Sequence, residues 1–218
     1  MTNTAAAHIN DFWDFDLAAP QPTQDAELLR QLQFVPGLKE ILMVRQVHAL
    51  EHATVWVLGE VSAAKTTKYS ATTLDSDNSS LGGLSTDKGF YIYGQVNLAD
   101  LKRAASIALQ RLTSGEWNLA VHPRCGTNLS VGMFLTASLT LGAHLILPRG
   151  PIEQILGISL AAVTATQLAP DLGSLVQKYL TTAIPFNLAI ADIERTTDFW
   201  GNHSYFVKVC WQDQTKGL

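Results

Sequence analysis

Charged side chains are scarce in this chain: Asp, Glu, Lys and Arg make up 16% of its 218 residues, against roughly 25% in an average soluble domain. Cysteine is nearly absent, because Cys125 and Cys210 are the only two, and this excludes a disulfide-rich scaffold. A formal net charge of −4 excludes the basic footprint of a nucleic-acid-binding protein, so we expect no nucleic-acid partner. Neither a glycine-rich phosphate loop nor a dinucleotide fingerprint occurs. Hydrophobic residues, at 47%, exclude a disordered chain.

The missing charge is concentrated in one region. Residues 129–170 contain only Arg149 and Glu153 as charged residues, and residues 125–148 contain none. A helix over residues 129–147 is about 28 Å long, close to the roughly 30 Å of a bilayer's hydrocarbon core. A proline-rich break at 148–151 separates it from a second apolar stretch at 152–169. The pattern predicts a transmembrane helical hairpin with the lipid bilayer as partner; the alternative is two buried helices of a soluble core.

The distribution of basic residues predicts an orientation for this hairpin. Arg111, Arg124 and Lys178 lie on the side of the two chain ends, whereas the hairpin loop has only Arg149. Because basic residues favour the cytoplasmic side, we expect the polar parts there. The first residues have neither a basic region nor an apolar core, so no signal peptide is predicted.

Outside the hairpin the pattern indicates an α+β fold, in which a small sheet packs with a long helix. We predict helices at 26–34, 38–60 and 98–112, the last capped by Asn97, strands at 90–96, 117–121, 186–193 and 205–211, and a loop at 62–88. The expected organisation is a lead-in with a short amphipathic helix (1–35), an α+β half (36–128), the membrane hairpin (129–170) and a C-terminal β-hairpin that packs on the α+β half (171–218).

The predicted long helix carries the motif H-x-x-E-H at His48, Glu51 and His52. Residues four apart project from one helix face, so both imidazoles can reach one metal ion. Glu51 can lie beside that ion without binding it. This is the order of the inverted zinc-peptidase motif, in which the glutamate is the general base for a metal-bound water. The alternative is a pair of helix-surface histidines with a solvated glutamate.

A second motif, H-P-R-C-G-T-N, begins at His122 and precedes the hairpin. His122 and Cys125 have the spacing of a metal-ligand pair, and Thr127 or Asn128 can cap the next helix. A catalytic zinc needs a third protein ligand, and the candidates are Glu60, Glu116, His122 and Cys125. If His48, His52, His122 and Cys125 all bind zinc, the site is closed and hydrolysis is disfavoured. The alternative is a helix-capping loop without a metal.

The remaining histidines and the second cysteine rank lower as site residues. His144 lies in the first predicted membrane helix, where we expect a hydrogen-bonded packing role near the interface. His203 falls in a predicted turn and His8 in a predicted tail, and Cys210 is expected to be a small buried residue of a strand.

Three segments, HALEHATVWVLGE, GLSTDKGFYIYGQV and LAVHPRCGTNLSVG, resemble an uncharacterised family of cyanobacterial membrane proteins. The pair of motifs is also similar to the wider YqhQ-like family of bacterial membrane proteins, with H-G-A-E-H and a later H-x-R-C-G-T. Ala49 stands where that family tends to have glycine, and this chain has fewer predicted spans. The resemblance covers mainly residues 38–60 and 84–148. It implies a membrane protein of the plasma or thylakoid membrane with a shared polar site, and it implies no activity.

Three hypotheses follow. The first is an integral membrane metalloprotein, with zinc as cofactor and a peptidase-like hydrolase activity in which Glu51 is the catalytic base. The second is a non-catalytic membrane scaffold or assembly factor with a structural metal or hydrogen-bonded site, acting in a larger membrane protein complex. The third is a soluble domain whose apolar stretches form its core. The sequence alone leaves open whether the protein is an enzyme.

Overall fold

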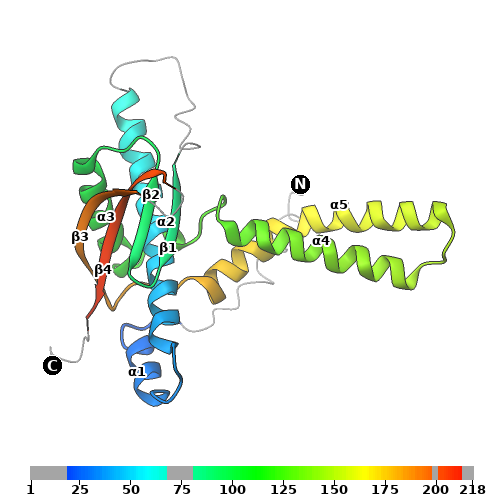
Figure 1. Cartoon of the computed structure of the whole chain (residues 1–218), viewed down its shortest axis with the longest axis horizontal. Coiled ribbons are helices and arrows are strands. Elements are labelled where there is room, and N and C mark those ends of the chain that lie inside the picture. The colour runs from blue at the N-terminus through cyan, green and yellow to red at the C-terminus, as the bar shows by residue number, and fades with distance from the viewer. Residues whose placement is uncertain (1–18, 68–80, 198–200, 213–218) are drawn as a thin grey trace, which may run out of the picture.

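The computed structural model describes residues 19–67, 81–197 and 201–212 (Figure 1). The helices are α1 (Gln24–Gln31), α2 (Leu38–Thr67), α3 (Leu98–Thr113), α4 (Gly126–Ile146) and α5 (Pro151–Val176), with a 3₁₀ turn η3 (Trp117–Ala120) and a π-helical turn η4 (Gln177–Thr181). The strands are β1 (Gly82–Thr86), β2 (Gly89–Tyr93), β3 (Leu188–Thr197) and β4 (His203–Trp211). The predictions for residues 1–18 with His8, for 68–80 and for the turn at 198–200 fall outside the described residues.

The described strands form one antiparallel sheet in the order β1-β2-β4-β3, so the prediction of a mixed helix and sheet fold is confirmed. One face of the sheet packs on α2 and α3. Phe90 and Ile92 of β2 and Val207 of β4 point to that face and are fully buried. Tyr91 and Phe206 pair on the opposite face, with ring centroids 4.7 Å apart. The alternation of apolar residues along these strands therefore sets which face meets the helices.

The part of the described structure outside the hairpin of α4 and α5 is called the polar domain. The helix α2 forms its centre, because this helix is apolar on most of its sides. Val47, Ala49 and Val55 point to different sides of the helix, and all are buried. The helix runs seven residues beyond its predicted end at Glu60, because the residues that follow include no glycine or proline until the described part stops. The helix α3 begins as predicted, with the Asn97 side chain accepting a hydrogen bond from the backbone N–H of Ala99 at 2.8 Å.

Two segments of this domain were assigned the wrong secondary structure from the sequence. Residues 82–86 were predicted to be loop but form the edge strand β1. The sequence of this segment lacks the alternation of a strand, and the segment is held in strand conformation by its pairing with β2. Residues 117–121 were predicted to be a strand but begin with η3. That segment follows a tight turn at Gly115 (φ 115°), and the backbone N–H of Val121 bonds to the carbonyl of Asn118 instead of to a strand.

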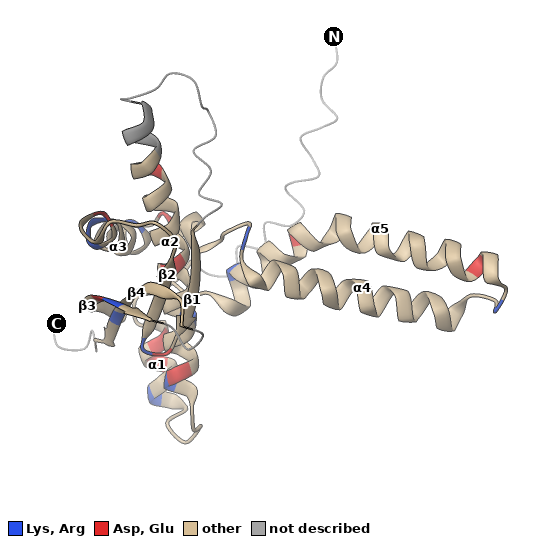
Figure 2. Ribbon diagram, turned by 45° about the horizontal axis from the view of Figure 1, so that its top comes forward, with Lys and Arg blue, Asp and Glu red and all other residues tan. Residues whose placement is uncertain are grey.

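The helices α4 and α5 form a hairpin that projects away from the polar domain (Figure 1). Charged residues are nearly absent along it (Figure 2). The two segments Gly126–Ile146 and Pro151–Thr181 are long and apolar enough to cross a membrane. In the most apolar 18 residues of each segment, 0% and 11%, respectively, are buried inside the structure. Large apolar side chains such as Phe134 and Leu145 are over 70% exposed. If these were two buried helices of a soluble core, other residues would cover these side chains. The described residues do not cover them.

Small residues let the two hairpin helices approach closely. Gly132 faces the Cβ of Ala169, and a Cβ at Gly157 would overlap the side chain of Leu147. Such contacts are typical of helix pairs in membranes. The helix α5 continues through Pro170, past its predicted end, and its last part packs against the start of α4 beside the polar domain.

Candidate metal centre

The centre is built on one turn of α2. His48 and His52 are four residues apart on the helix, and their ring centroids are 4.3 Å apart. Cys125, from the loop before α4, lies opposite them with its Sγ 3.2 Å from Nε2 of His48. One potential ligand atom from each of these three residues lies within 4.8 Å of the others. The structure thus brings together three of the four residues that the sequence predicted as metal ligands.

Backbone carbonyls orient both imidazoles. His48 Nδ1 donates to the carbonyl of Thr181 at 3.0 Å, and His52 Nδ1 donates to the carbonyl of Ala120 at 2.7 Å. Because a carbonyl only accepts, each neutral ring carries its proton on Nδ1 and leaves Nε2 as an electron-pair donor. Metal-binding histidines are usually held in this way by an acceptor on the far nitrogen. Neither carbonyl could be identified from the sequence, because backbone acceptors have no residue-type signature.

Cys125 is the residue that caps α4. Its Sγ accepts a hydrogen bond from the backbone N–H of Thr127 at 3.4 Å, so the cap is the cysteine and not Thr127 or Asn128 as predicted. Burial raises the pKa of the Cys125 thiol, but the neighbouring His52 and the hydrogen bond from Thr127 outweigh this, and the pKa lies below its ordinary value. A lowered pKa favours the thiolate, which is the form that binds metals.

A π-helical turn at the end of α5 fixes the loop that carries Cys125. Within η4 the buried Gln177 accepts a hydrogen bond from the backbone N–H of His122 at 2.9 Å and donates to Asn128 at 2.6 Å. The same turn presents the Thr181 carbonyl to His48. Single π-turns occur frequently at functional sites. Sequence analysis missed Gln177, because a lone glutamine after an apolar helix carries no signal for this role.

Glu51 lies beside the centre and faces the sheet. It is 7% exposed, and Ser85 of β1 donates a hydrogen bond to its Oε2 at 2.7 Å. A Cβ at Gly83 would overlap the Glu51 carboxylate, so only glycine leaves room for it. Burial raises the pKa of Glu51, and the opposing effects of Ser85 and His48 do not offset the burial. Ser85 and Gly83 were missed because their segment was predicted to be loop.

His122 lies next to the three-residue group but is not a member of it. Its ring centroid is 5.8 Å from that of His52 and 4.9 Å from that of Trp56. Its Nδ1 accepts a hydrogen bond from the backbone N–H of Arg124 at 3.3 Å. Burial, together with the neighbouring His52 and Arg124, lowers the pKa of His122 to about 4, so this ring is neutral near pH 7.

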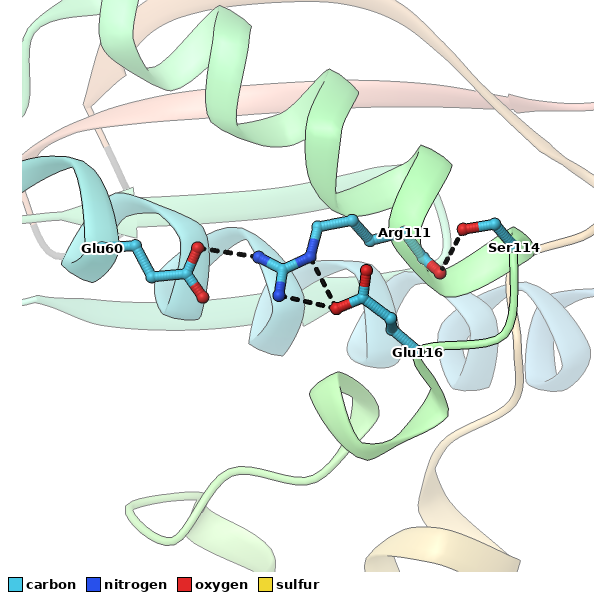
Figure 3. A network of polar contacts seen from close by, with 4 residues as sticks. All are labelled: Glu60, Arg111, Ser114 and Glu116. Atoms are coloured by element: carbon cyan, nitrogen blue, oxygen red, sulfur yellow. Dashed lines mark hydrogen bonds and ion pairs between the residues drawn. The ribbon is translucent and has the colours of Figure 1, made fainter.

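The two glutamates considered as third ligands lie in a different network (Figure 3). Arg111 of α3 pairs with Glu60 at 2.7 Å and with Glu116 at 2.6 Å. Glu60 and Glu116 therefore join α2 to the turn after α3, and the residue that completes the group of three is Cys125. Separations along the sequence could not distinguish these candidates.

The other candidate residues are also placed by the structure. His144 Nδ1 lies 2.9 Å from Oε1 of Gln154 at the tip of the hairpin, as the predicted hydrogen bond requires, but the residue is exposed rather than packed. His203 is the exposed first residue of β4. The prediction for Cys210 was wrong: the residue is exposed, because Val207 and Val209 occupy the inward positions of β4.

Comparison with known proteins places these residues within one family. A family model described as a domain of unknown function (DUF6391) matches residues 43–193, from α2 to β3. The chain belongs to the DUF6391 family. An uncharacterised protein of Picosynechococcus sp. is 52% identical over 204 residues, covering 94% of this chain and 97% of the relative. No solved structure matches the chain. The predicted membership of an uncharacterised family with a cyanobacterial relative is confirmed, and all residues of the candidate centre lie within the matched DUF6391 segment.

Proposed function

We propose that the chain is an integral membrane metalloprotein that binds zinc through His48, His52 and Cys125 and has a metal-dependent, peptidase-like hydrolase activity. The observation that carries the proposal is the convergence of these three ligand atoms, with both histidines held by backbone carbonyls. A nitrogen and a sulfur that bind one tetrahedral zinc lie about 3.6 Å apart. The 3.2 Å between His48 and Cys125 needs to open only slightly to admit the ion.

Three protein ligands leave the fourth position of a tetrahedral zinc for water, as in catalytic sites. A zinc ion held by His48, His52 and Cys125 would supply an activated water as nucleophile near neutral pH. Glu51 adjoins His52 and has a raised pKa, which suits a group that takes and returns a proton. Ser85 holds one of its carboxylate oxygens, and this fixes its direction. Glu51 is therefore the proposed general base.

The hairpin of α4 and α5 is the proposed membrane anchor. The centre lies at its base, because Cys125 directly precedes α4 and Thr181 ends the turn after α5. Arg111, Arg124 and Lys178 on this side, against Arg149 at the tip, favour a polar domain on the cytoplasmic side of the plasma or thylakoid membrane. A substrate would then be bound close to the membrane surface.

A second candidate function is a non-catalytic scaffold or assembly factor of a larger membrane complex. It is favoured by the way in which the same residues join α2, the start of α4 and the turn after α5, as a structural site would. Structural metals contribute directly to folding, whereas loss of a general base does not remove the metal.

The experiment that separates the two compares wild type, Glu51→Gln and His48→Ala, with His203→Ala at the exposed start of β4 as a matched control. Zinc is measured by mass spectrometry in detergent-purified protein, and hydrolysis is measured with fluorescently labelled casein. The hydrolase proposal expects Glu51→Gln to keep its zinc and lose turnover, and His48→Ala to lose both. Zinc in the wild type without turnover would favour the scaffold. Absence of zinc from the wild type would refute the metalloprotein and the scaffold with a structural metal, and would leave the scaffold with a hydrogen-bonded polar site.

A further inference from the structure

A cavity of about 680 Å³ lies between α1, the first half of α2, η3 and η4. Its volume is within the range of about 300–1,000 Å³ typical of small-molecule sites. None of His48, His52 and Cys125 lines it. Ala120 lines it and also accepts the hydrogen bond from His52, so this residue lies between His52 and the cavity. The cavity is therefore distinct from the proposed metal centre.

One part of the cavity wall is apolar and aromatic. Trp117 of η3, Tyr179 of η4 and Phe186 after η4 contribute rings, and Ile184 adds an aliphatic side chain. Aromatic rings with a polar edge suit the boundary between an apolar ligand body and water. This part of the wall suits an apolar group.

The other part of the wall is polar and already internally bonded. Gln46 and Asn187 are 0% and 1% exposed, and Gln46 Nε2 donates to Asn187 Oδ1 at 3.2 Å. Gln46 also donates to Asp25 at 2.5 Å, which holds the one acidic side chain of the lining in place. The two cations of the lining, Arg45 and Lys178, leave it with a net positive charge of one.

Arg45 has a hydrogen-bonding group to spare. One of its terminal nitrogens donates to the carbonyls of Tyr179 at 3.3 Å and Thr182 at 3.1 Å, which fixes the guanidinium. Its buried Nε has no hydrogen-bond partner among the described residues. An unpaired buried donor is costly, and an anionic oxygen is the partner that satisfies a guanidinium best.

The cavity also has a defined position relative to the hairpin. Lys178 and Tyr179 belong to η4, which directly follows the apolar helix α5. We propose that the cavity binds an anionic amphiphile, with its acidic head at Arg45 and Lys178 and its apolar body along Trp117, Tyr179 and Phe186. Such a ligand can enter from a membrane surface at the base of the hairpin. The proposal does not depend on the metal.

The test uses tryptophan quenching by brominated amphiphiles in the full chain, reconstituted in nanodiscs of neutral phosphatidylcholine. Bromine quenches at contact distance, and Trp117 lies in the wall of the cavity. Dibromostearate and a dibrominated lysophosphatidate present the two possible acidic heads on similar chains, and dibromostearate methyl ester presents none. We expect saturable quenching by at least one acid. The stronger of the two identifies a carboxylate or a phosphate head. Equal quenching by the methyl ester would overturn the proposal.

Two variants locate the binding in the cavity. Ala183→Phe fills it and should abolish the saturable quenching, whereas the matched control Ala99→Phe, on the exposed start of α3, should leave it unchanged. Lys178→Gln, at an exposed position, should weaken binding about three- to five-fold. If Ala183→Phe fails to fold, Lys178→Gln and the methyl ester still test whether an acidic head is bound. Unchanged affinity for the acid in Lys178→Gln or in folded Ala183→Phe would contradict the assignment.

Discussion

The contact between Gly83 and Glu51 gives a sharp test of the environment of the proposed base. In Gly83→Ala the new methyl group would overlap the carboxylate of Glu51, a residue that is only 7% exposed and accepts a hydrogen bond from Ser85. The side chain cannot retreat into solvent, so it must leave Ser85 or displace β1. Overpacking of a buried site costs about 1–3 kcal/mol, and loss of the hydrogen bond adds about 0.5–1.5 kcal/mol. We expect Gly83→Ala to lower the free energy of unfolding by about 2–4 kcal/mol.

A double-mutant cycle isolates this contact. Unfolding is followed by fluorescence in detergent for Gly83→Ala, Glu51→Ala and the double variant. Without the carboxylate, the cost of the Gly83 substitution should fall below about 1 kcal/mol. Gly82→Ala is the matched control, since a Cβ there only touches Tyr93 at 3.9 Å and should cost little. An equal cost of Gly83→Ala in both backgrounds would show that Glu51 does not lie against β1, and the reasoning would fail.

Three further predictions concern other parts of the molecule. Alkaline carbonate should leave the full chain in the membrane fraction; its release without detergent would contradict the membrane anchor. In metal-free protein, His122 has a folded pKa of about 4 against 6.5 when unfolded, so the unfolded chain takes up the proton first and stability falls as pH drops from 6.5 to 4. His122→Gln should reduce this loss of stability, measured by thermal melts at different pH values, by on the order of 1 kcal/mol for a half-exposed ring. An unchanged dependence of stability on pH in this variant would contradict the prediction. Arg111→Met, which removes both ion pairs of Figure 3, should cost about 1 kcal/mol in denaturant unfolding without loss of zinc.

The parts of the site that could be predicted from sequence are those set by local spacing. The four-residue separation of His48 and His52 on an apolar helix predicts that both rings share a face, and the structure places them 4.3 Å apart. The charge-poor stretch at 129–170 likewise predicts the two long apolar helices, because length and composition are local properties. Asn97 follows the same logic as a helix cap.

The parts that could not be predicted depend on contacts between distant segments. Sequence left Glu60, Glu116, His122 and Cys125 as candidates for the third ligand, and only the packing of the loop before α4 against α2 brings Cys125 to His48. The strand β1 was missed because its first residues are glycines, which have a low strand propensity. Of these, Gly83 allows the close approach of β1 to Glu51. The cavity lies between segments separated by more than a hundred residues, so no local pattern indicates it.

The central claim is that His48, His52 and Cys125 bind one metal ion together. Cobalt(II) replaces zinc in such sites and reports a bound thiolate by its near-ultraviolet charge-transfer absorption. We predict this band in the purified wild type and in Cys210→Ser, whose cysteine is exposed on β4, and its loss in Cys125→Ser. His48→Ala and His52→Ala should lower cobalt affinity, because each removes one of the three ligands. A wild-type protein that takes up cobalt without the thiolate band, or a Cys125→Ser variant that keeps it, would contradict the proposed centre.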